Sequence, residues 1–233
     1  MTEVVVRGLT KHFGALRAVQ ELSFDVPAGQ VSGFLGPNGS GKTTTLRMAL
    51  GLVRPTAGEA FVGGRRYGEL DHPRRVVGAQ LEATGFHPGR RGRDHLRILA
   101  RDADVPAGRV DEVLEMVDLT DAADRRVGGY SLGMRQRLGL ASALLGDPAV
   151  LILDEPANGL DPAGIAWLRD LLRQQAKDGR AILVSSHVLS EVAQVVDQVV
   201  IVSEGRLRFA GPLDSLGGES LETAFLNLTG SNR

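Results

Sequence analysis

The chain contains 233 residues with 27 basic and 28 acidic side chains, a formal net charge of −1 and no cysteine. This length is that of one domain with a substantial hydrophobic core. The balanced charge excludes a uniformly basic nucleic-acid-binding protein, and the lack of cysteine excludes disulfides, cysteine nucleophiles and thiolate metal sites. The first residues lack the pattern of a signal peptide, and the longest apolar run, Ala149 to Leu153, is far shorter than the roughly 20 residues of a membrane-spanning helix. We therefore expect a soluble protein that reaches a membrane only through a partner.

Apolar runs of strand length alternate along the chain with helical patterns, which indicates an α/β domain. The predicted strands are Glu3–Val6, Val31–Leu35, Ala149–Leu153, Ala181–Ser185 and Gln198–Val202. The predicted helices are Lys42–Leu50, Arg93–Asp102, Arg109–Asp118, Ser131–Leu145, Pro162–Lys177 and Leu189–Val196. A predicted hairpin turns at Glu204-Gly205, and a short amphipathic helix follows over Glu219–Leu228. Between about Gln80 and Arg126 the strand runs vanish, which predicts a helical insertion into the α/β core.

The segment between the second predicted strand and the first predicted helix reads Gly-Pro-Asn-Gly-Ser-Gly-Lys-Thr and fits the phosphate-loop motif G-x-x-x-x-G-K-[ST]. Glycines let the backbone N–H groups surround a phosphate chain, Lys42 can reach the β- and γ-phosphates, and the Thr43 hydroxyl can bind Mg²⁺. A glycine-rich turn without chemistry is the alternative, and the flanking strand and helix argue against it. The predicted nucleotide-binding residues of this loop are Gly36, Pro37, Asn38, Gly39, Ser40, Gly41, Lys42, Thr43 and Thr44.

A pair of carboxylates, Asp154 and Glu155, follows the apolar strand Ala149–Leu153. Two acids at the end of a buried strand are costly unless cations or hydrogen bonds receive their charge, and ligands bind at this edge of a parallel sheet. Because side chains alternate along a strand, we expect Asp154 to face the metal and Glu155 to face an attacking water.

Together these residues resemble the ATP-binding cassette family, the nucleotide-binding subunits of ABC transporters, over nearly the whole chain. Residues 130–137, Tyr-Ser-Leu-Gly-Met-Arg-Gln-Arg, resemble the family signature LSGGQ-x-Q-R. The Asn-Gly-Leu-Asp sequence that ends at Asp161 resembles the D-loop, and His187 resembles the switch histidine. Phe13 lies where the family carries an aromatic residue that stacks on adenine, although residue type alone would place Phe13 in the core.

The resemblance implies an α/β fold, namely a P-loop NTPase core of the ABC ATPase type with an N-terminal antiparallel β subdomain and an inserted helical subdomain. It implies one ATP-binding domain over residues 1–230, with a core at 1–79 and 127–210, a helical insertion at about 80–126 and a short tail at 211–233. The implied cofactors are ATP and Mg²⁺. The implied partners are a second copy or a related ATP-binding subunit in a head-to-tail dimer, and a separate transmembrane permease, with no nucleic acid. The implied place is the cytoplasmic face of the cell membrane.

The resemblance also assigns roles to single residues. Hydrolysis of ATP to ADP and phosphate would use Glu155, His187 and Lys42, and Mg²⁺ would be held by Thr43, Asp154 and Glu82. Residue type alone favours an ordinary surface histidine at a helix start for His187. The apolar strand before it reverses that preference in favour of a functional histidine. The signature residues that would contact the ATP of the partner subunit are Ser131, Leu132, Gly133 and Met134.

The chain departs from the family pattern at three places. In the signature, Leu132 replaces a glycine and Met134 replaces glutamine, while the phosphate-binding positions, Ser131 among them, are kept. The family glutamine of the Q-loop falls on Glu82, with Gln80 as the minority candidate. The D-loop carries Asn-Gly where Ser-Ala is usual, and the sequence offers no interpretation of that change.

The altered signature, Glu82 and the sequence of residues 221–226 together resemble the branch that exports antibiotics, lantibiotics and similar amphiphiles. The alternative function is a soluble cassette ATPase that acts on ribosomes or DNA. Such proteins usually carry two cassettes or long coiled-coil or zinc insertions, which are absent from this sequence. A non-hydrolysing regulatory module is disfavoured because the family's catalytic residues are all present.

The helical insertion corresponds in position to the lobe that receives the membrane subunit. Its cluster Gly89-Arg90-Arg91-Gly92-Arg93 could contact an acidic partner or anionic lipid, although a solvated arginine-rich turn is the simpler interpretation of the cluster alone. Leu81 and Phe86 are better candidates for a groove that holds a partner.

Overall fold

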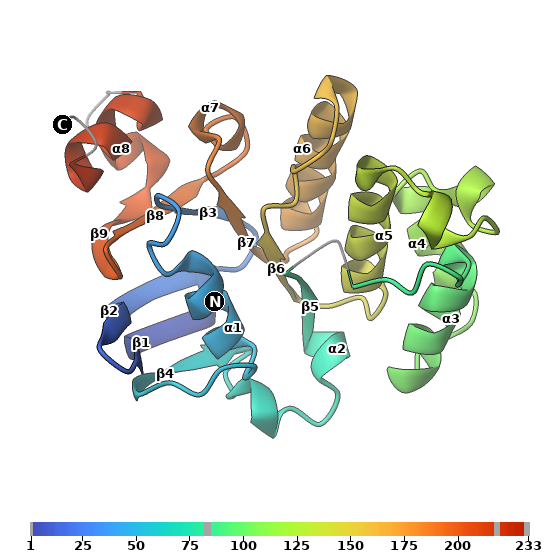
Figure 1. Ribbon diagram of the computed structural model, residues 1–233, viewed down its shortest axis with the longest axis horizontal. Helices are drawn as coiled ribbons and strands as arrows, with labels where there is room; N and C mark the ends of the chain where they lie inside the picture. Colours follow the sequence, from blue (N-terminus) through green and yellow to red (C-terminus); the bar gives the residue numbers. More distant parts are fainter. Residues whose placement is uncertain (1, 82–84, 217–219, 231–233) are drawn as a thin grey trace.

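A computed structural model of the protein describes residues 2–81, 85–216 and 220–230. It contains two β-sheets with helix α1 (Lys42–Ala49) packed between them, and further helices lie on the other face of the larger sheet and at one end of the molecule (Figure 1). The smaller sheet is antiparallel and has the strand order β2-β1-β4. Its strands are β1 (Thr2–Phe13), β2 (Leu16–Pro27) and β4 (Ala57–Val62).

The larger sheet has six strands in the order β5-β6-β7-β3-β8-β9, and only β9 runs antiparallel to its neighbour. These strands are β3 (Val31–Leu35), β5 (Val77–Gln80), β6 (Val150–Asp154), β7 (Ala181–Ser186), β8 (Gln198–Ser203) and β9 (Arg206–Pro212). The central strands β3, β6 and β7 are buried along their whole length, as their largely apolar sequences predict.

Alternating residues of the large sheet build two separate cores. On β6, Val150 and Ile152 pack toward the small sheet, whereas Leu151 and Leu153 pack toward the helices. Since side chains alternate along a strand, the next residue on the first face is Asp154. The alternation of side chains along β6 therefore places the Asp154 carboxylate on the face of the sheet where it meets Thr43 of the phosphate loop.

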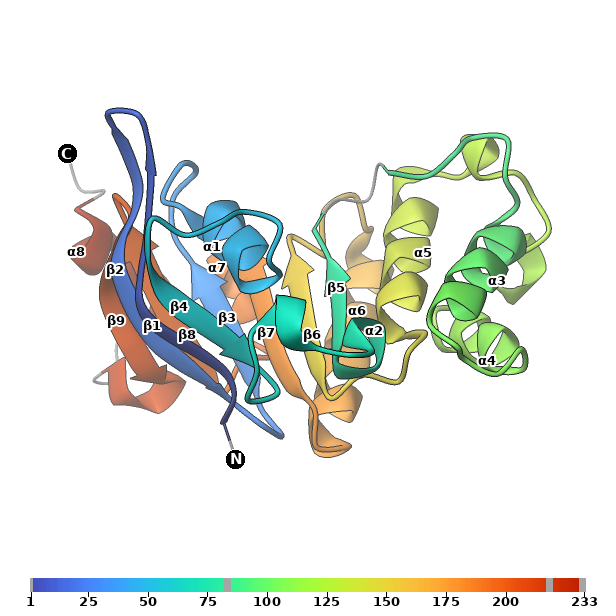
Figure 2. The same ribbon diagram turned by 90° about the horizontal axis from the view of Figure 1, so that it is seen from below.

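The helices have distinct places around the sheets. They are α1 (Lys42–Ala49), α2 (Pro73–Val76), α3 (Gly92–Asp102), α4 (Arg109–Met116), α5 (Leu132–Leu144), α6 (Pro162–Lys177), α7 (Leu189–Val192) and α8 (Leu221–Thr229). Helices α3 and α4 lie at the end of the molecule opposite the small sheet, with α5 between them and β5 (Figures 1 and 2). Within the described part of the chain, every helix is too short or too polar to cross a lipid bilayer.

Most predicted elements of the core are confirmed, and some are corrected. The antiparallel strands β2 and β4 and the edge strand β5 were not among the predicted strands. The prediction of a helix over Leu189–Val196 is wrong in length, because α7 ends at Val192. The chain then turns, and Asp197 anchors it to β3 by accepting a hydrogen bond from the Val31 N–H at 2.8 Å. The start of the last predicted helix, Glu219, lies outside the described residues.

Candidate nucleotide-binding site

Three neighbouring parallel strands end together at one edge of the large sheet. Leu35 at the end of β3 pairs with Ser186 on β7, and Asp154 at the end of β6 pairs with Ser185. The phosphate loop, the two carboxylates and His187 follow these strand ends directly. The parallel register therefore brings motifs that are distant in sequence to one place, as the topology of open α/β sheets predicts.

Close approach to neighbouring strands requires glycine at two positions of the phosphate loop. A Cβ atom at Gly36 would collide with the Val202 carbonyl oxygen of β8. Gly41 has φ 98°, and a Cβ there would collide with the Ala18 carbonyl oxygen of β2. The loop therefore packs between strands of both sheets. It leads into the start of α1, where backbone N–H groups favour bound anions.

Lys42 is the first residue of α1 and is 7% exposed. Its Nζ donates to the Gly36 carbonyl oxygen at 2.6 Å and to the Pro37 carbonyl oxygen at 3.3 Å. Burial lowers the pKa of Lys42, and the negative charges of Glu155 and Asp154 oppose that shift. A phosphate group beside the ammonium would replace the lost hydration, so the site favours an anionic ligand.

Asp154 is held by two hydroxyl groups. Thr43 Oγ1 donates to Asp154 Oδ2 at 2.7 Å, and Ser185 Oγ donates to Asp154 Oδ1. Asp154 is only 8% exposed. A threonine hydroxyl beside a carboxylate is a pair of hard oxygen donors and therefore fits a divalent cation such as Mg²⁺. Ser185 was not among the predicted site residues, because no motif marks it.

Glu155 leaves the strand in a left-handed backbone conformation with φ 52°. Such a conformation costs a non-glycine residue roughly 1–2 kcal/mol. Its N–H donates to Ser185 Oγ at 3.0 Å and lies 3.2 Å from the Ser185 carbonyl oxygen, which holds the turn in place. Glu155 Oε2 is 2.8 Å from His187 Nδ1, with the two side chains 21% and 51% exposed. The structure thus joins the predicted base and the predicted switch histidine.

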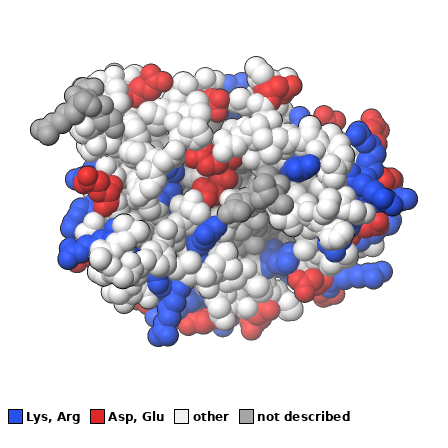
Figure 3. All heavy atoms as spheres, in the orientation of Figure 1, with Lys and Arg blue, Asp and Glu red and all other residues white. Residues whose placement is uncertain are grey.

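Lys42, Thr43, Asp154 and Glu155 border a cleft of about 710 Å³, which is large enough for a nucleotide. His187 and Ser185 are not among its lining residues. Phe13 lies on its wall and is 49% exposed, with Lys11 Nζ at 4.9 Å from its ring centre. The cleft also contains residues that no motif predicted: Leu16, Arg17, Gln20 and Glu204. Leu16, Arg17 and Gln20 lie on β2, which was not among the predicted strands. Glu204 was identified only as a turn residue. Figure 3 shows charges of both signs spread over one face of the molecule, with acidic side chains near its centre.

The signature residues lie elsewhere. Ser131 is the N-cap of α5, and its Oγ accepts a hydrogen bond from the Met134 N–H at 3.2 Å. Asp161 caps α6 by accepting from the Gly164 N–H at 2.7 Å. Both N-caps border a hollow of about 320 Å³ that shares no lining residue with the nucleotide cleft. Within one chain, the signature therefore does not contribute to the cleft that holds Lys42.

Gln80, the minority candidate for the Q-loop role, points into the protein. It is buried, and its Nε2 donates to the Gln136 side chain of α5. Gln136 Nε2 in turn donates to the Glu155 carbonyl oxygen at 3.4 Å. A Cβ at Gly139 would lie 2.8 Å from Gln80 Cδ, so glycine makes room for this contact. Glu82, the other candidate, lies outside the described residues.

Replacing Gln136 by Leu should remove both links. The buried Gln80 amide would lose its side-chain partner and keep only the 3.5 Å bond to the backbone carbonyl of residue 136, so we expect the free energy of unfolding to fall by about 1–3 kcal/mol. Denaturant unfolding measures this change. Gln174→Leu is the control, because exposed Gln174 on α6 donates only to Asp178, at 2.9 Å, and a surface change of this kind stays within about 0.5 kcal/mol. Equal losses of unfolding free energy in the two variants would contradict a stabilising role for the hydrogen bonds from Gln80 to Gln136 and from Gln136 to Glu155.

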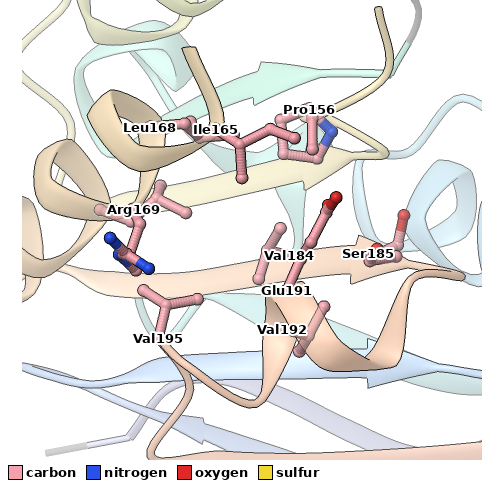
Figure 4. A pocket seen from close by; sticks show the side chains of 12 residues that line it. Pro156, Ile165, Leu168, Arg169, Val184, Ser185, Glu191, Val192 and Val195 are labelled. Atoms are coloured by element: carbon pink, nitrogen blue, oxygen red, sulfur yellow. The ribbon is translucent and has the colours of Figure 1, made fainter. Parts of the chain in front are cut away.

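A second cavity lies behind the catalytic edge. It measures about 40 Å³ and is lined by apolar side chains of α6, β7 and the α7 segment, among them Ile165, Val184 and Val192, together with the charged Arg169 and Glu191 (Figure 4). Arg169 donates to the Gln194 side chain. A cavity of this size is far too small for a nucleotide.

Comparisons with known proteins agree with this geometry. A family described as "ABC transporter" matches residues 19–158. The bacitracin transport ATP-binding protein BcrA of Bacillus licheniformis is 42% identical over 235 aligned positions, which cover 100% of this chain and 77% of that protein. The lantibiotic transport ATP-binding protein SrtF of Streptococcus pyogenes is 34% identical over 222 positions and 95% of each chain.

Solved structures show the same fold. An ATP-binding subunit of an ABC transporter is 26% identical and has a TM-score of 0.89 over 97% of this chain and 99% of that chain. A dimeric ATP-binding cassette in a post-hydrolysis state, bound to ADP and Pi, is 22% identical and has a TM-score of 0.81 over 90% of this chain and 98% of that chain. The expected fold class is confirmed.

Proposed function

The chain belongs to the ABC transporter family of ATP-binding proteins, and from this membership we propose that it is the ATP-hydrolysing subunit of an exporter for an antibiotic or a similar amphiphile. The family hydrolyses ATP. Two relatives carry names that state bacitracin transport and lantibiotic transport, which favours export over action on ribosomes or DNA. The observation that carries the proposal is the cleft in which Lys42, Thr43, Asp154 and Glu155 converge.

The proposed mechanism assigns one task to each of these side chains. Lys42 neutralises the negative charge of the phosphates, which grows in the transition state of phosphoryl transfer. Thr43 and Asp154 would hold Mg²⁺, which supplies further charge neutralisation when bound. Glu155 orients the attacking water and accepts its proton, and His187, 2.8 Å away, fixes the direction of that carboxylate.

We also propose that the site is completed by a second copy of the chain. The hollow beside the signature residues and the nucleotide cleft have no lining residue in common. This separation of the signature from the nucleotide site of its own chain supports the proposal. Ser131 is the N-cap of α5, and the N–H groups and dipole of a helix start favour a phosphate. A head-to-tail dimer would place this helix start of one copy over the ATP of the other.

A separate membrane permease is the proposed partner at the α3–α4 end. Two side chains of this end are unusually exposed for their type, Ile98 at 48% and Met116 at 38%. The basic cluster is partly neutralised, because Arg93 is only 17% exposed and pairs with Asp111 and Asp124. Leu81 and Phe86, the predicted groove residues, are both partly buried against the cores. Apolar contact is therefore better supported than attraction by the arginines.

Co-expression with a multi-span membrane protein, sought among the products of the neighbouring genes, tests the proposal. The chain should enter detergent extracts of the membrane only when that protein is present. Addition of bacitracin or a lantibiotic to the purified complex should then raise its ATPase rate. Co-sedimentation with ribosomes, without membrane association, would instead support the alternative function.

A further inference from the structure

Two residues that differ from the family pattern touch each other in the structure. Leu132 is the first residue of α5, and Gly159 lies in the segment between β6 and α6 with φ 78°. A Cβ atom on Gly159 would overlap Leu132 Cγ and Cδ2 and would lie 3.1 Å from Leu132 Cβ. Glycine at 159 is therefore the residue that leaves space for leucine at 132.

The contact is part of a closely packed surface. A Cβ on Gly133 would lie 3.3 Å from the Gly159 carbonyl oxygen and 3.5 Å from Leu160 Cδ2, so the first turn of α5 rests directly on the backbone of residues 158–161. Leu132 is 50% exposed, and both segments line the hollow of about 320 Å³. One side of Leu132 meets Gly159, and the other side meets solvent.

The segment beneath Leu132 is bonded to the catalytic turn. The Asn158 N–H donates to the Glu155 carbonyl oxygen at 3.2 Å, and the Leu160 N–H donates to the Ala157 carbonyl oxygen at 3.1 Å. A displacement of Gly159 would therefore act on the turn that orients the Glu155 carboxylate. Leu132 and Gly159 are absent from the lining of the cleft around Lys42.

We propose that Leu132 and Gly159 form a complementary pair that fixes the start of α5 on the segment 158–161, and so positions the signature surface and Glu155 together. Leu132 is thus a positioning residue, and the two departures from the family pattern compensate for each other. The catalytic part of this inference rests on the proposed function, since it concerns the site shared with a second copy. The contact itself lies within one chain and does not depend on that function.

A double-mutant cycle tests the pair, with the variants Gly159→Ala, Leu132→Gly and their combination. Alanine at 159 meets two obstacles, the positive φ and the overlap with Leu132. The first is the same in both backgrounds, whereas the second disappears when Leu132 becomes glycine. We expect Gly159→Ala to lower the ATPase kcat about tenfold in the Leu132 background, with the KM for ATP nearly unchanged. In the Leu132→Gly background the loss should be about threefold or less.

Gly64→Ala is the matched control, because Gly64 has φ 79° and no atom within 4 Å of an added Cβ. Its effect on unfolding should be equal in the two backgrounds. Leu132→Ala gives a second test, since it leaves a Cβ at 3.1 Å and should suppress the defect only in part. The Gly159→Ala defect should then decrease in the order Leu, Ala, Gly at position 132.

An equal loss of kcat from Gly159→Ala in all three backgrounds would overturn the proposal. Thermal unfolding of the same variants reports the contact without ATP. If the unmodified chain did not hydrolyse Mg-ATP, the proposed function would fail, yet the coupling between positions 132 and 159 would still appear in the unfolding data. Unfolding effects that simply add would refute the pair even in an active ATPase.

Discussion

Glu155→Gln should lower the rate of ATP hydrolysis by roughly 100-fold to 10,000-fold, the range that removal of a general base gives. The amide keeps the shape of the side chain but cannot accept the proton of the attacking water. The backbone bonds from the Glu155 N–H to Ser185 do not involve the carboxylate, so the strained turn should remain. ATP binding should persist, because Lys42 and the phosphate loop are untouched.

The same variant should accumulate an ATP-bound dimer, since hydrolysis is the step expected to reopen it. Steady-state ATPase assays and size-exclusion chromatography with Mg-ATP measure the two effects. Glu204→Gln is the control, because this carboxylate lines the same cleft from the β8–β9 turn but pairs with Arg208, at 3.5 Å, rather than with His187. Its rate should stay within about threefold of the unmodified protein, a change of under 1 kcal/mol in activation free energy. Hydrolysis by Glu155→Gln at an unchanged rate would remove Glu155 from the mechanism.

The sequence was sufficient to predict the central strands and the motifs that follow them. The run Val31–Leu35 is largely apolar and Val150–Leu153 is apolar throughout, and the phosphate-loop and carboxylate motifs follow them, so strand pattern and chemistry agree. The strands β2 and β4 alternate buried and exposed residues, a pattern that a search for continuous apolar runs misses. Irregular registers also interrupt the alternation where β1 pairs with β2. Edge strand β5 has only four residues, too few for a periodic signal.

Contacts between distant segments could not be predicted. The sequence identified Leu132 and the Asn-Gly of the D-loop as departures, but not that Leu132 lies on Gly159. Likewise, Gln80 was weighed as a ligand in the nucleotide site, whereas its side chain pairs with Gln136 of α5. The role of a glycine or of a buried amide depends on the atoms that pack against it. A single sequence does not specify those atoms.

Lys42→Met should weaken ATP binding by about 100-fold, which corresponds to about 2.8 kcal/mol. Methionine retains the buried apolar stem but carries no charge for the β- and γ-phosphates. Because the buried ammonium is partly desolvated, its removal should leave the unfolding temperature of the free protein unchanged or higher, while the stabilisation by ATP is lost. Calorimetric titration and thermal unfolding separate these effects, and Lys177→Met at the exposed end of α6 is the control.

The pKa of Lys42 adds a pH dependence with a defined sign. Burial lowers this pKa in the free protein, whereas bound phosphates favour the ammonium and raise it again. ATP binding should therefore take up protons, and ATP affinity should fall as the pH rises through the lowered pKa. Titrations in buffers of different ionisation enthalpy measure this uptake. The Lys42→Met variant should lose the Lys42 contribution to it, and an identical proton uptake in both proteins would show that Lys42 does not change its protonation when ATP binds.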